Sequence, residues 1–374
     1  MTLSSLISGA AWNCTLTFLP VKKNKVVFSH FYGKGFGDSP KAIALALRDA
    51  APGADIVWLI SDPSVALPVG IRPASYAPLS RIYHLSTARV WVDDCRKGAR
   101  YKKKGQFYLQ TWHGFALKQI EQDAAASLPA DYPAYAMRDS RQTDLMVSGS
   151  RFMTGRYRHA FWYSGEVAEY GSPRNDILFE PPDGLREKVC SALGISPKKK
   201  LILYAPTFRV DGSLSAYSID IPGVISACDQ RFGGDHVMLL RLHPNIAASA
   251  SQLSCNGNTA VQATNYPDIQ ELLAVADVVI TDYSSVMFDF ALTRRPVFQF
   301  ATDIAAYQKD RSFYFPLDQL PFPLAESNDA LLCAISAYDE DAASSRWLQF
   351  AKENGIHEDG RAASRCASWI QAHL

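Results

Sequence analysis

A short apolar strand that runs into a polar turn and then a helix occupies residues 276–296, and it constrains the fold more than any other segment. The run 278–280 consists of three consecutive β-branched residues, a pattern typical of a buried parallel strand. Ser284 and Ser285 follow, and apolar residues then recur at helical spacing over 286–291. A strand followed directly by a helix is one βα unit, and repeated βα units build a parallel sheet covered by helices on both faces.

The same alternation of strands and helices continues along the chain. The runs with strand character are residues 25–29, 55–60, 90–93, 107–111, 145–148, 201–204, 237–242, 278–281 and 297–300. A polar connection at 181–184, rich in proline and glycine, separates two βα series. We therefore predict an α/β protein with two Rossmann-like, doubly wound domains, residues 1–180 and 181–343. Residues 344–374 have helical character, and we expect them to pack back on the first domain.

The polar turns of this sequence follow predicted strands. Ligands of open parallel sheets bind at the carboxyl ends of the strands, so two such domains are expected to face a central cleft lined by these turns. The chain has 374 residues, and 48% of them are hydrophobic, which is ample for two cores.

Composition and missing motifs argue against several classes of protein. The net charge of +1 gives no reason to expect a nucleic-acid partner. The seven cysteines lack the CxxC spacing of zinc sites and suit reduced, packed thiols. A Walker-type loop and a GxSxG elbow are both absent, which argues against a P-loop ATP site and an α/β-hydrolase. Because no acidic cluster suggests an obligate metal, we expect no obligate cofactor; a divalent cation would suit the chemistry but is not indicated.

Two segments have a possible role at a membrane surface. Residues 3–19 place apolar side chains on one helical face, but they are shorter than the ~20 residues of a membrane span and lack the basic start of a signal peptide. Residues 1–20 therefore form either a helix on an anionic membrane surface or a helix packed on its own domain. The run 96–104 carries six lysines and arginines and no acid, which is typical of a solvated loop or of a surface that docks an anionic substrate.

The turn after the strand 278–281 has the pattern of a phosphate site. Ser284 and Ser285 stand where a helix begins, and free N–H groups at such a position attract phosphate. Asp289 follows one turn later, close enough to meet a sugar hydroxyl of a nucleotide whose diphosphate sits on the serines. The alternative is a capped helix with an acidic residue near its start.

A second turn, residues 111–114, carries His113 and Gly114 directly after a predicted strand. A histidine at a strand end can project into a cleft, and with an ordinary pKa of ~6.5 it can accept a proton at neutral pH. We interpret His113 as a candidate proton acceptor; a structural histidine near a tight turn is the alternative.

Further candidates for substrate binding lie in the second half of the chain. Arg241 and His243 alternate along one strand, so both would share a face and suit a diphosphate, unless the strand is simply an edge strand with a polar face. Thr207 and Arg209 follow another strand and suit a phosphate or an acceptor. Glu271 stands at a helix start, where it would either face the nucleotide or remain a solvated carboxylate.

Seven motifs occur in a specific order. They are FYGKGFGDSPK (31–41), TWHG (111–114), GSPRND (171–176), LYAPTFR (203–209), RLHP (241–244), TDYSSVMFD (281–289) and FYF (313–315). In this order the chain resembles the CDP-glycerol glycerophosphotransferases of wall teichoic acid and capsule synthesis, over roughly residues 20–365. It departs from the family in having DSPK and GSPR in place of the more usual DNPK and GYPR, which bears on substrate choice.

The resemblance implies a GT-B architecture and a peripheral enzyme on the cytoplasmic face of the cell membrane. Such enzymes transfer an alditol phosphate from its CDP-activated form to a hydroxyl of a polyprenyl-linked saccharide or growing polymer, and they release CMP. The expected donor is CDP-glycerol, with CDP-ribitol left open. The length of the chain is similar to that of the family's primases, which add a single unit. A nucleotide-sugar glycosyltransferase of GT-B fold and a catalytically silent partner protein are the alternatives.

The resemblance also implies roles for individual residues. His113 matches the family's candidate base, and His243 matches the histidine near the donor pyrophosphate. Ser284 and Ser285 match the phosphate-binding pair. Asp289 stands seven residues before Pro296, the spacing at which GT-B enzymes place a ribose-binding carboxylate.

Overall fold

The chain forms two compact units, each with its own sheet. The computed structural model describes residues 12, 14, 18–99, 101–207, 209, 218–242, 259–310 and 312–374. The first unit comprises Met1–Gly114, Ile120–Asp176 and Gly355–Leu374, and the second comprises Phe115–Gln119 and Ile177–Asn354. The chain thus enters the main part of the second unit near the polar connection at 181–184.

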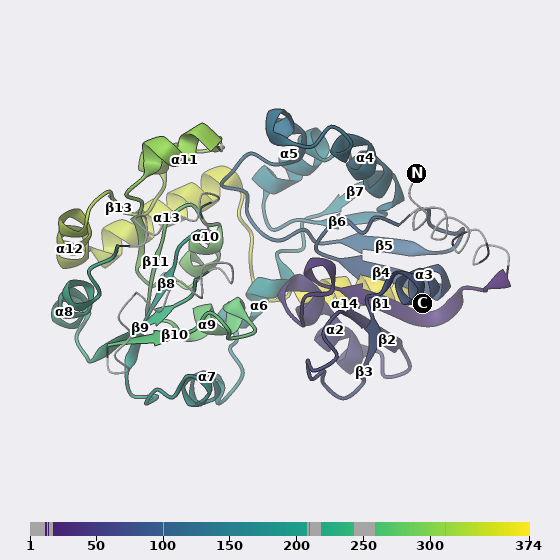
Figure 1. Cartoon of the computed structure of the whole chain (residues 1–374), viewed down its shortest axis with the longest axis horizontal. Coiled ribbons are helices and arrows are strands. Elements are labelled where there is room, and N and C mark those ends of the chain that lie inside the picture. Colours follow the sequence, from purple (N-terminus) through teal and green to yellow (C-terminus); the bar gives the residue numbers. More distant parts are fainter. Residues whose placement is uncertain are drawn as a thin grey trace. The chain divides into compact units, whose positions relative to one another are not determined.

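The first unit contains a seven-stranded sheet in the order β3-β2-β1-β4-β5-β6-β7, and the strands pair in parallel (Figure 1). The strands are β1 (Lys22–Ser29), β2 (Asp55–Ile60), β3 (Ile71–Ser75), β4 (Ala88–Asp93), β5 (Phe107–Gln110), β6 (Leu145–Val147) and β7 (Glu166–Ala168). The helices are η1 (Phe31–Gly33), α2 (Asp38–Ala50), α3 (Pro78–Thr87), η2 (Glu121–Ser127), α4 (Tyr132–Gln142), α5 (Arg151–Ala160), η3 (Pro173–Asn175) and α14 (Ala362–Ala372).

Strand β1 shows how this sheet buries both of its faces. Val26 and Phe28 belong to the core that α2 and α14 cover, whereas Val27 belongs to the core that α3 covers. Alternate residues of a strand point to opposite faces, so a sheet covered on both sides needs an unbroken apolar run. The β-branched runs of the sequence have this physical cause.

The second unit contains a six-stranded parallel sheet in the order β10-β9-β8-β11-β12-β13. The strands are β8 (Lys200–Ala205), β9 (His236–Leu240), β10 (Ala260–Gln262), β11 (Val278–Thr281), β12 (Val297–Phe300) and β13 (Leu324–Ala325). The helices are α7 (Leu185–Leu193), α8 (Ile221–Phe232), α9 (Ile269–Val275), α10 (Val286–Ala291), α11 (Ile304–Asp310), η7 (Leu317–Gln319), α12 (Asn328–Ser336) and α13 (Glu340–Asn354). A short helix, α6 (Asp176–Phe179), lies where the chain passes between the units.

Each sheet has one topological switch point, where neighbouring strands lead the chain in opposite directions. In the first unit this point lies between β1, which is followed by β2 on one side, and β4, which is followed by β5 on the other. In the second unit it lies between β8 and β11. Ligands of doubly wound sheets bind outside the carboxyl ends of the strands at such points. The turns after these four strands are therefore the places to look for chemistry.

The sequence pattern missed four strands. Strand β3 is an edge strand with mostly exposed residues and contains Pro73, which suits an edge position. Strands β7, β10 and β13 have three, three and two residues, too few for a periodic pattern to show. Every strand that the sequence predicted is present.

The C-terminal helices belong to different units, unlike the single segment 344–374 that we expected. Helix α13 lies in the second unit, where Phe350 stacks against Phe288 and contacts Phe115. Helix α14 lies in the first unit and packs on α2. The division falls between Asn354 and Gly355 because aromatic residues tie only the first of the two helices to the second unit.

Three cations of the basic run 96–104 are paired with acidic side chains. Arg96 is buried and pairs with Glu121 at 2.8 Å, and Lys97 is buried and pairs with Asp93 at 2.6 Å. Lys102 pairs with Asp144. For Arg96 and Lys97 neither alternative, a solvated loop or a docking surface, holds, because both side chains are buried and paired with acids that lie outside the run.

The N-terminal segment 1–20 lies largely outside the described residues. Trp12 is described, and it packs edge-on against Tyr101 in the core beneath α3. This contact favours, for residue 12, a helix packed on its own domain. Of the helices that the structure describes, none combines the length and the apolar character that crossing a bilayer requires.

The aromatic cluster around α13 gives a first prediction. Replacing Phe350 by alanine removes a buried ring that contacts Phe115, Phe288 and Phe315. We expect the free energy of unfolding of the second unit to fall by about 3–5 kcal/mol. Leu348→Ala, on an exposed position of the same helix, should change it by less than about 0.5 kcal/mol. Urea unfolding followed by tryptophan fluorescence measures both, and equal effects of the two changes would contradict the packing argument.

Candidate active site

A buried carboxylate organises the switch point of the second unit. Asp282 directly follows β11, and its Oδ1 accepts the N–H of Thr207 at 2.7 Å and the N–H of Tyr283 at 2.6 Å. Thr207 lies two residues beyond β8, so this carboxylate ties together the ends of the two central strands. Ser284 and Ser285 follow, half-buried, at the start of α10. The turn with Ser284 and Ser285 therefore lies at the switch point of the second sheet.

Arg209 acts as a clamp in this unit. Its guanidinium donates to both oxygens of Asp303 at 2.6 and 2.9 Å and pairs with Asp282 at 2.8 Å. Its planar face lies over the rings of Tyr283 and Tyr307. The sequence suggested a direct contact from Arg209 to a phosphate or an acceptor, but the structure directs its N–H groups to these carboxylates. The buried Asp282 beside the turn requires a paired cation, and Arg209 supplies it while also pairing with the partly exposed Asp303.

Thr207 reaches the switch point through its backbone N–H, whose partner is Asp282. Arg241 lies at the carboxyl end of β9, and its Nη1 donates to the carbonyl oxygens of Ala263 at 2.9 Å, Thr264 at 2.5 Å and Tyr266. These bonds shape the loop after β10. His243, the histidine predicted to share the face of Arg241, lies outside the described residues.

Two predicted carboxylates of the second unit are buried. Glu271 pairs with Lys188 at 2.7 Å and accepts the hydroxyl of Tyr266 at 2.6 Å, so it is not a solvated helix-start residue. Asp289 lies in the first turn of α10, where its Oδ2 accepts a hydrogen bond from Gln270 at 3.3 Å. Both carboxylates thus lie near the carboxyl ends of the sheet with protein partners already in place.

The His113 turn follows β5 in the first unit. Trp112 has a left-handed φ of 53°, and Gln110 accepts its N–H at 2.8 Å. The imidazole of His113 stacks on the indole of Trp112, with ring centroids 4.2 Å apart, and remains exposed. The turn therefore places a solvent-accessible imidazole at the carboxyl edge of the sheet.

Gly114 permits a close approach that no other residue would. It has a φ of +104°, and a Cβ there would lie 1.9 Å from Nη2 of Arg174. Arg174 in turn donates from Nη1 to Asp38 at 2.9 Å. The glycine therefore packs a guanidinium directly behind His113, and an Asp38–Arg174 ion pair holds that guanidinium in place.

The surroundings of His113 keep its imidazole neutral. Desolvation by the surrounding protein lowers the pKa of His113 to about 4, and the charges of Arg174 and His30 act in the same direction against that of Asp38. Water reaches the exposed ring and limits this desolvation, but the lowered pKa still leaves the imidazole of His113 neutral at pH 7. A neutral imidazole at pH 7 can accept a proton.

Sequence reasoning missed two aspartates in the first unit, Asp38 and Asp94, and treated His30 as structural. His30 follows β1, and its Nδ1 is hydrogen-bonded to Asp94, which follows β4. Asp38 begins α2, and burial, which alone would raise its pKa, is outweighed by Arg174 and His30, so the pKa of Asp38 is lowered. The available signal was position: each of these histidine and aspartate residues stands just beyond a predicted strand or inside a motif.

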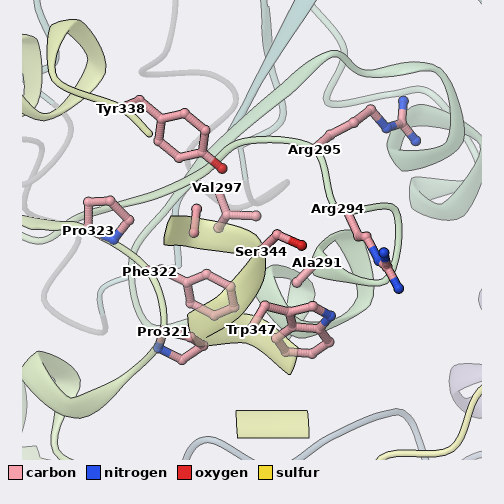
Figure 2. Close-up of a pocket in the computed structure, with 11 residues that line it drawn as sticks. Ala291, Arg294, Arg295, Val297, Pro321, Phe322, Pro323, Tyr338, Ser344 and Trp347 are labelled. Atoms are coloured by element: carbon pink, nitrogen blue, oxygen red, sulfur yellow. The ribbon is translucent and has the colours of Figure 1, made fainter. Parts of the chain in front are cut away.

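A separate pocket of the second unit lies away from these turns (Figure 2). Trp347, Phe322 and Tyr338 line it, with Arg294 at its side. It adjoins Val297, the first residue of β12, and so lies at the amino end of that strand. None of the predicted site residues lines this pocket. Across the residues described here, no three histidine, cysteine or acidic side chains gather as metal ligands.

Comparison with known proteins identifies similar sequences. A family model described as "CDP-Glycerol:Poly(glycerophosphate) glycerophosphotransferase" matches residues 12–372. The teichoic acid poly(glycerol phosphate) polymerase of Staphylococcus epidermidis is 35% identical over 318 residues, which cover 81% of this chain but 44% of that protein. The teichoic acid glycerol-phosphate transferase of Staphylococcus aureus is 30% identical over 373 residues, covering 95% of this chain and 94% of that protein. The chain thus spans less than half the length of the polymerase.

Solved structures show the same architecture. The wall teichoic acid polymerase TagF, in a histidine variant, aligns with a TM-score of 0.83 at 27% identity and covers 100% of this chain and 98% of that chain. Another TagF variant, soaked with CDPG, aligns with a TM-score of 0.84 at 28% identity, covering 98% and 93%. The predicted GT-B-like class, with two Rossmann-like doubly wound domains, is confirmed.

The close approach at Gly114 gives a second prediction. Gly114→Ala should destabilise the protein by about 1–3 kcal/mol, because alanine is strained at a φ of +104° and its Cβ would displace Arg174. Gly155→Ala is the matched control, because Gly155 lies within α5 with open space around it. That change should stabilise the protein by about 0.5–1 kcal/mol. Thermal and urea unfolding report both values; a neutral Gly114→Ala would show that Arg174 does not depend on this glycine.

Proposed function

Because the chain belongs to the CDP-glycerol:poly(glycerophosphate) glycerophosphotransferase family, we propose that it transfers glycerol phosphate from CDP-glycerol to a hydroxyl of a lipid-linked saccharide or polymer. CMP is the second product. The reaction belongs to the synthesis of a teichoic acid or capsule-type polymer. The observation that carries this proposal is the family match over residues 12–372, which includes both switch points.

The reaction forms one bond and breaks one. The acceptor oxygen bonds to the β-phosphorus of CDP-glycerol, the phosphorus that bears the glycerol, while the bond from this phosphorus to the oxygen it shares with the α-phosphate breaks. The leaving CMP carries the α-phosphate, and the proton of the acceptor hydroxyl passes to a base. Enzymes accelerate such transfers mainly by positioning and by stabilising charge.

We assign the proton acceptor to His113. Its ring is exposed, its lowered pKa keeps it neutral at pH 7, and Trp112 fixes its orientation by stacking. Gly114 contributes by letting Arg174 pack behind the turn. A neutral, oriented imidazole at a strand end meets the requirements of a general base.

We assign donor binding to the second unit. Ser284 and Ser285 contribute hydroxyls and backbone N–H groups at the switch point, where Asp282 fixes the start of the turn. Arg241 and His243 follow β9, and we propose that His243 acts near the pyrophosphate, where a cation offsets charge on the leaving phosphate. The buried Asp289 and Glu271 and the half-buried Thr207 complete the proposed donor site, and Arg209 supports it as the clamp described above.

The donor is the point on which the alternatives differ. The two curated relatives described above are named for glycerol phosphate, which favours CDP-glycerol over CDP-ribitol. The TagF variant that was soaked with CDPG favours a CDP-activated alditol over a nucleotide sugar.

We also propose that the protein works on the cytoplasmic surface of the cell membrane, where a polyprenyl-linked acceptor would be found. Exposed apolar side chains of the first unit support this proposal. Leu79 and Tyr83 lie one turn apart on α3, and Phe18 precedes the exposed Lys22 and Lys23 of β1. Apolar side chains flanked by cations suit an anionic bilayer surface.

A donor screen tests the proposed function. Purified protein is supplied in turn with CDP-glycerol, CDP-ribitol and CDP-sugars, each with a set of lipid-linked and polymer acceptors, and CMP release is measured. We expect CMP from CDP-glycerol at a higher rate than from any other donor. Release of a nucleoside diphosphate instead would support a glycosyltransferase, and no turnover with any donor would contradict an enzyme of this family.

The base role of His113 gives a separate prediction. We expect His113→Ala to lower the rate of transfer by about 10²–10⁴-fold, because no base then receives the proton of the attacking hydroxyl. The dissociation constant of CDP-glycerol should stay within a few-fold, since His113 does not bind the donor. In the unchanged protein, activity should fall as the pH drops through the pKa of His113. Calorimetry that shows lost donor binding in His113→Ala would refute the assignment, and His159→Gln, on an exposed face of α5, is the control.

A further inference from the structure

The His30–Asp94 pair is a polar group of the first unit that the mechanism above leaves unused. His30 follows β1 and Asp94 follows β4, the two strands that flank the switch point. The side chain of Asp94 is 1% exposed, whereas that of His30 is 23% exposed. The pair therefore joins a fixed, buried carboxylate to an imidazole that solvent reaches.

The hydrogen bond determines which ring nitrogen faces the protein. Nδ1 of His30 is bonded to one oxygen of Asp94, and the other oxygen accepts the N–H of Phe31 at 2.9 Å. Nε2 lies beside Gly37, where a Cβ would stand 3.4 Å away. Within the part of the chain that the structure describes, Nε2 makes no hydrogen bond. This nitrogen is therefore the one that remains for a ligand.

The segment around His30 stores backbone strain. Phe31, Tyr32 and Asp38 have left-handed φ values of 38°, 59° and 56°. Each such residue costs about 1–3 kcal/mol and persists only where its surroundings hold it. Here Asp94 holds the N–H of Phe31, and the indole of Trp58 donates to the carbonyl of Gly35 at 2.9 Å. Strain of this kind clusters at ligand sites, which makes this segment a candidate for binding.

Several charged and titratable groups surround the imidazole. They are Asp93 at the end of β4, Asp94 directly after it, Asp38 of α2, Lys97, Arg174 of η3 and His113 after β5. Burial alone would lower the pKa of His30, but the hydrogen bond and charge of Asp94, with Asp38 and Asp93, raise it above its usual value. The pKa of His113 shifts the opposite way. Opposite shifts in one site separate a proton-bearing group from a proton acceptor.

We propose that His30, held through Nδ1 by Asp94, donates its Nε2–H to a phosphate oxygen of the acceptor. This inference rests on the proposed function and adds to it a phosphate-binding residue beside the proton acceptor. The partly exposed ring of Phe31 lies beside the imidazole and that of Tyr32 lies beside Phe31, and both offer apolar faces to the C–H groups of an alditol or a sugar. The acceptor that fits is therefore one whose phosphate lies close to its reactive hydroxyl, as in a terminal alditol phosphate.

The direct test follows His30 in the unchanged full-length chain by NMR. The C2–H signal is titrated from about pH 5 to 9, with and without sn-glycerol 3-phosphate as the probe. A bound phosphate dianion stabilises the imidazolium, so the pKa of His30 should rise by about half a unit or more. His159 is exposed and pairs with Asp123, and adding sn-glycerol 3-phosphate should leave its signal unchanged. An unchanged pKa of His30 overturns the inference.

Enzyme kinetics give the second test. We expect His30→Asn to raise KM for the acceptor by about tenfold or more, because a charge-assisted hydrogen bond is lost, while KM for CDP-glycerol stays within about threefold. In the unchanged protein, kcat/KM for the acceptor should fall as the pH rises through the pKa of His30, since the donated proton is then lost. Asp94→Asn removes the carboxylate that raises this pKa, so the fall should move to lower pH. If the role of Asp94 were purely structural, the pH at which kcat/KM for the acceptor falls would stay the same.

The outcomes separate this inference from the proposed function. If the unchanged protein releases no CMP from CDP-glycerol, the proposed function fails before any variant is made. If it is active, and His30→Asn keeps both the normal KM for the acceptor and the fall of kcat/KM at high pH, this inference alone is overturned. Should His30→Asn fail to fold by circular dichroism, the NMR titration of the unchanged chain decides. His159→Gln serves as the matched control and should leave both KM values unaltered.

Discussion

A buried carboxylate at the first position after a strand holds the carboxyl end of each sheet together. Asp94 follows β4 and accepts the N–H of Phe31, two residues beyond β1. Asp282 follows β11 and accepts the N–H of Thr207, two residues beyond β8. In both units the carboxylate bridges the two strands that flank the switch point. Backbone N–H groups that leave a parallel ladder there have no strand partner, and burying them unpaired would be costly, so a carboxylate satisfies them.

The two units differ in the cation that accompanies this carboxylate. In the second unit Arg209 pairs with Asp282 and remains charged at any pH that proteins experience. In the first unit the partner of Asp94 is His30, whose charge changes near neutral pH. A carboxylate that accepts backbone N–H groups is thus paired with a permanent cation in the second unit and with a titratable group in the first. This contrast agrees with the proposed placement of donor binding on the second unit and of proton transfer on the first.

The sequence allowed prediction of features that depend on local patterns, and it failed where distant residues meet. Every predicted strand is present because a strand buried on both faces must be apolar throughout, whereas the edge strand β3 lacks that pattern. His113 and the Ser284 turn lie at carboxyl ends, as strand order implied. Arg209 was expected to bind substrate, and its engagement by Asp303 became visible only in the folded chain, since the two stand 94 positions apart. His30 was set aside because Asp94, its partner, lies 64 positions away.

Fold class, the position of each βα turn and the family follow from the order of amino acids, because apolar periodicity and motif spacing are properties of neighbouring residues. The division of labour among polar side chains follows from the folded chain instead. Charges brought together from different strands decide which arginine clamps a turn. They also decide which lysines form buried ion pairs and which imidazole keeps its proton. Electrostatic and desolvation effects act through space, so no reading along the chain could assign them.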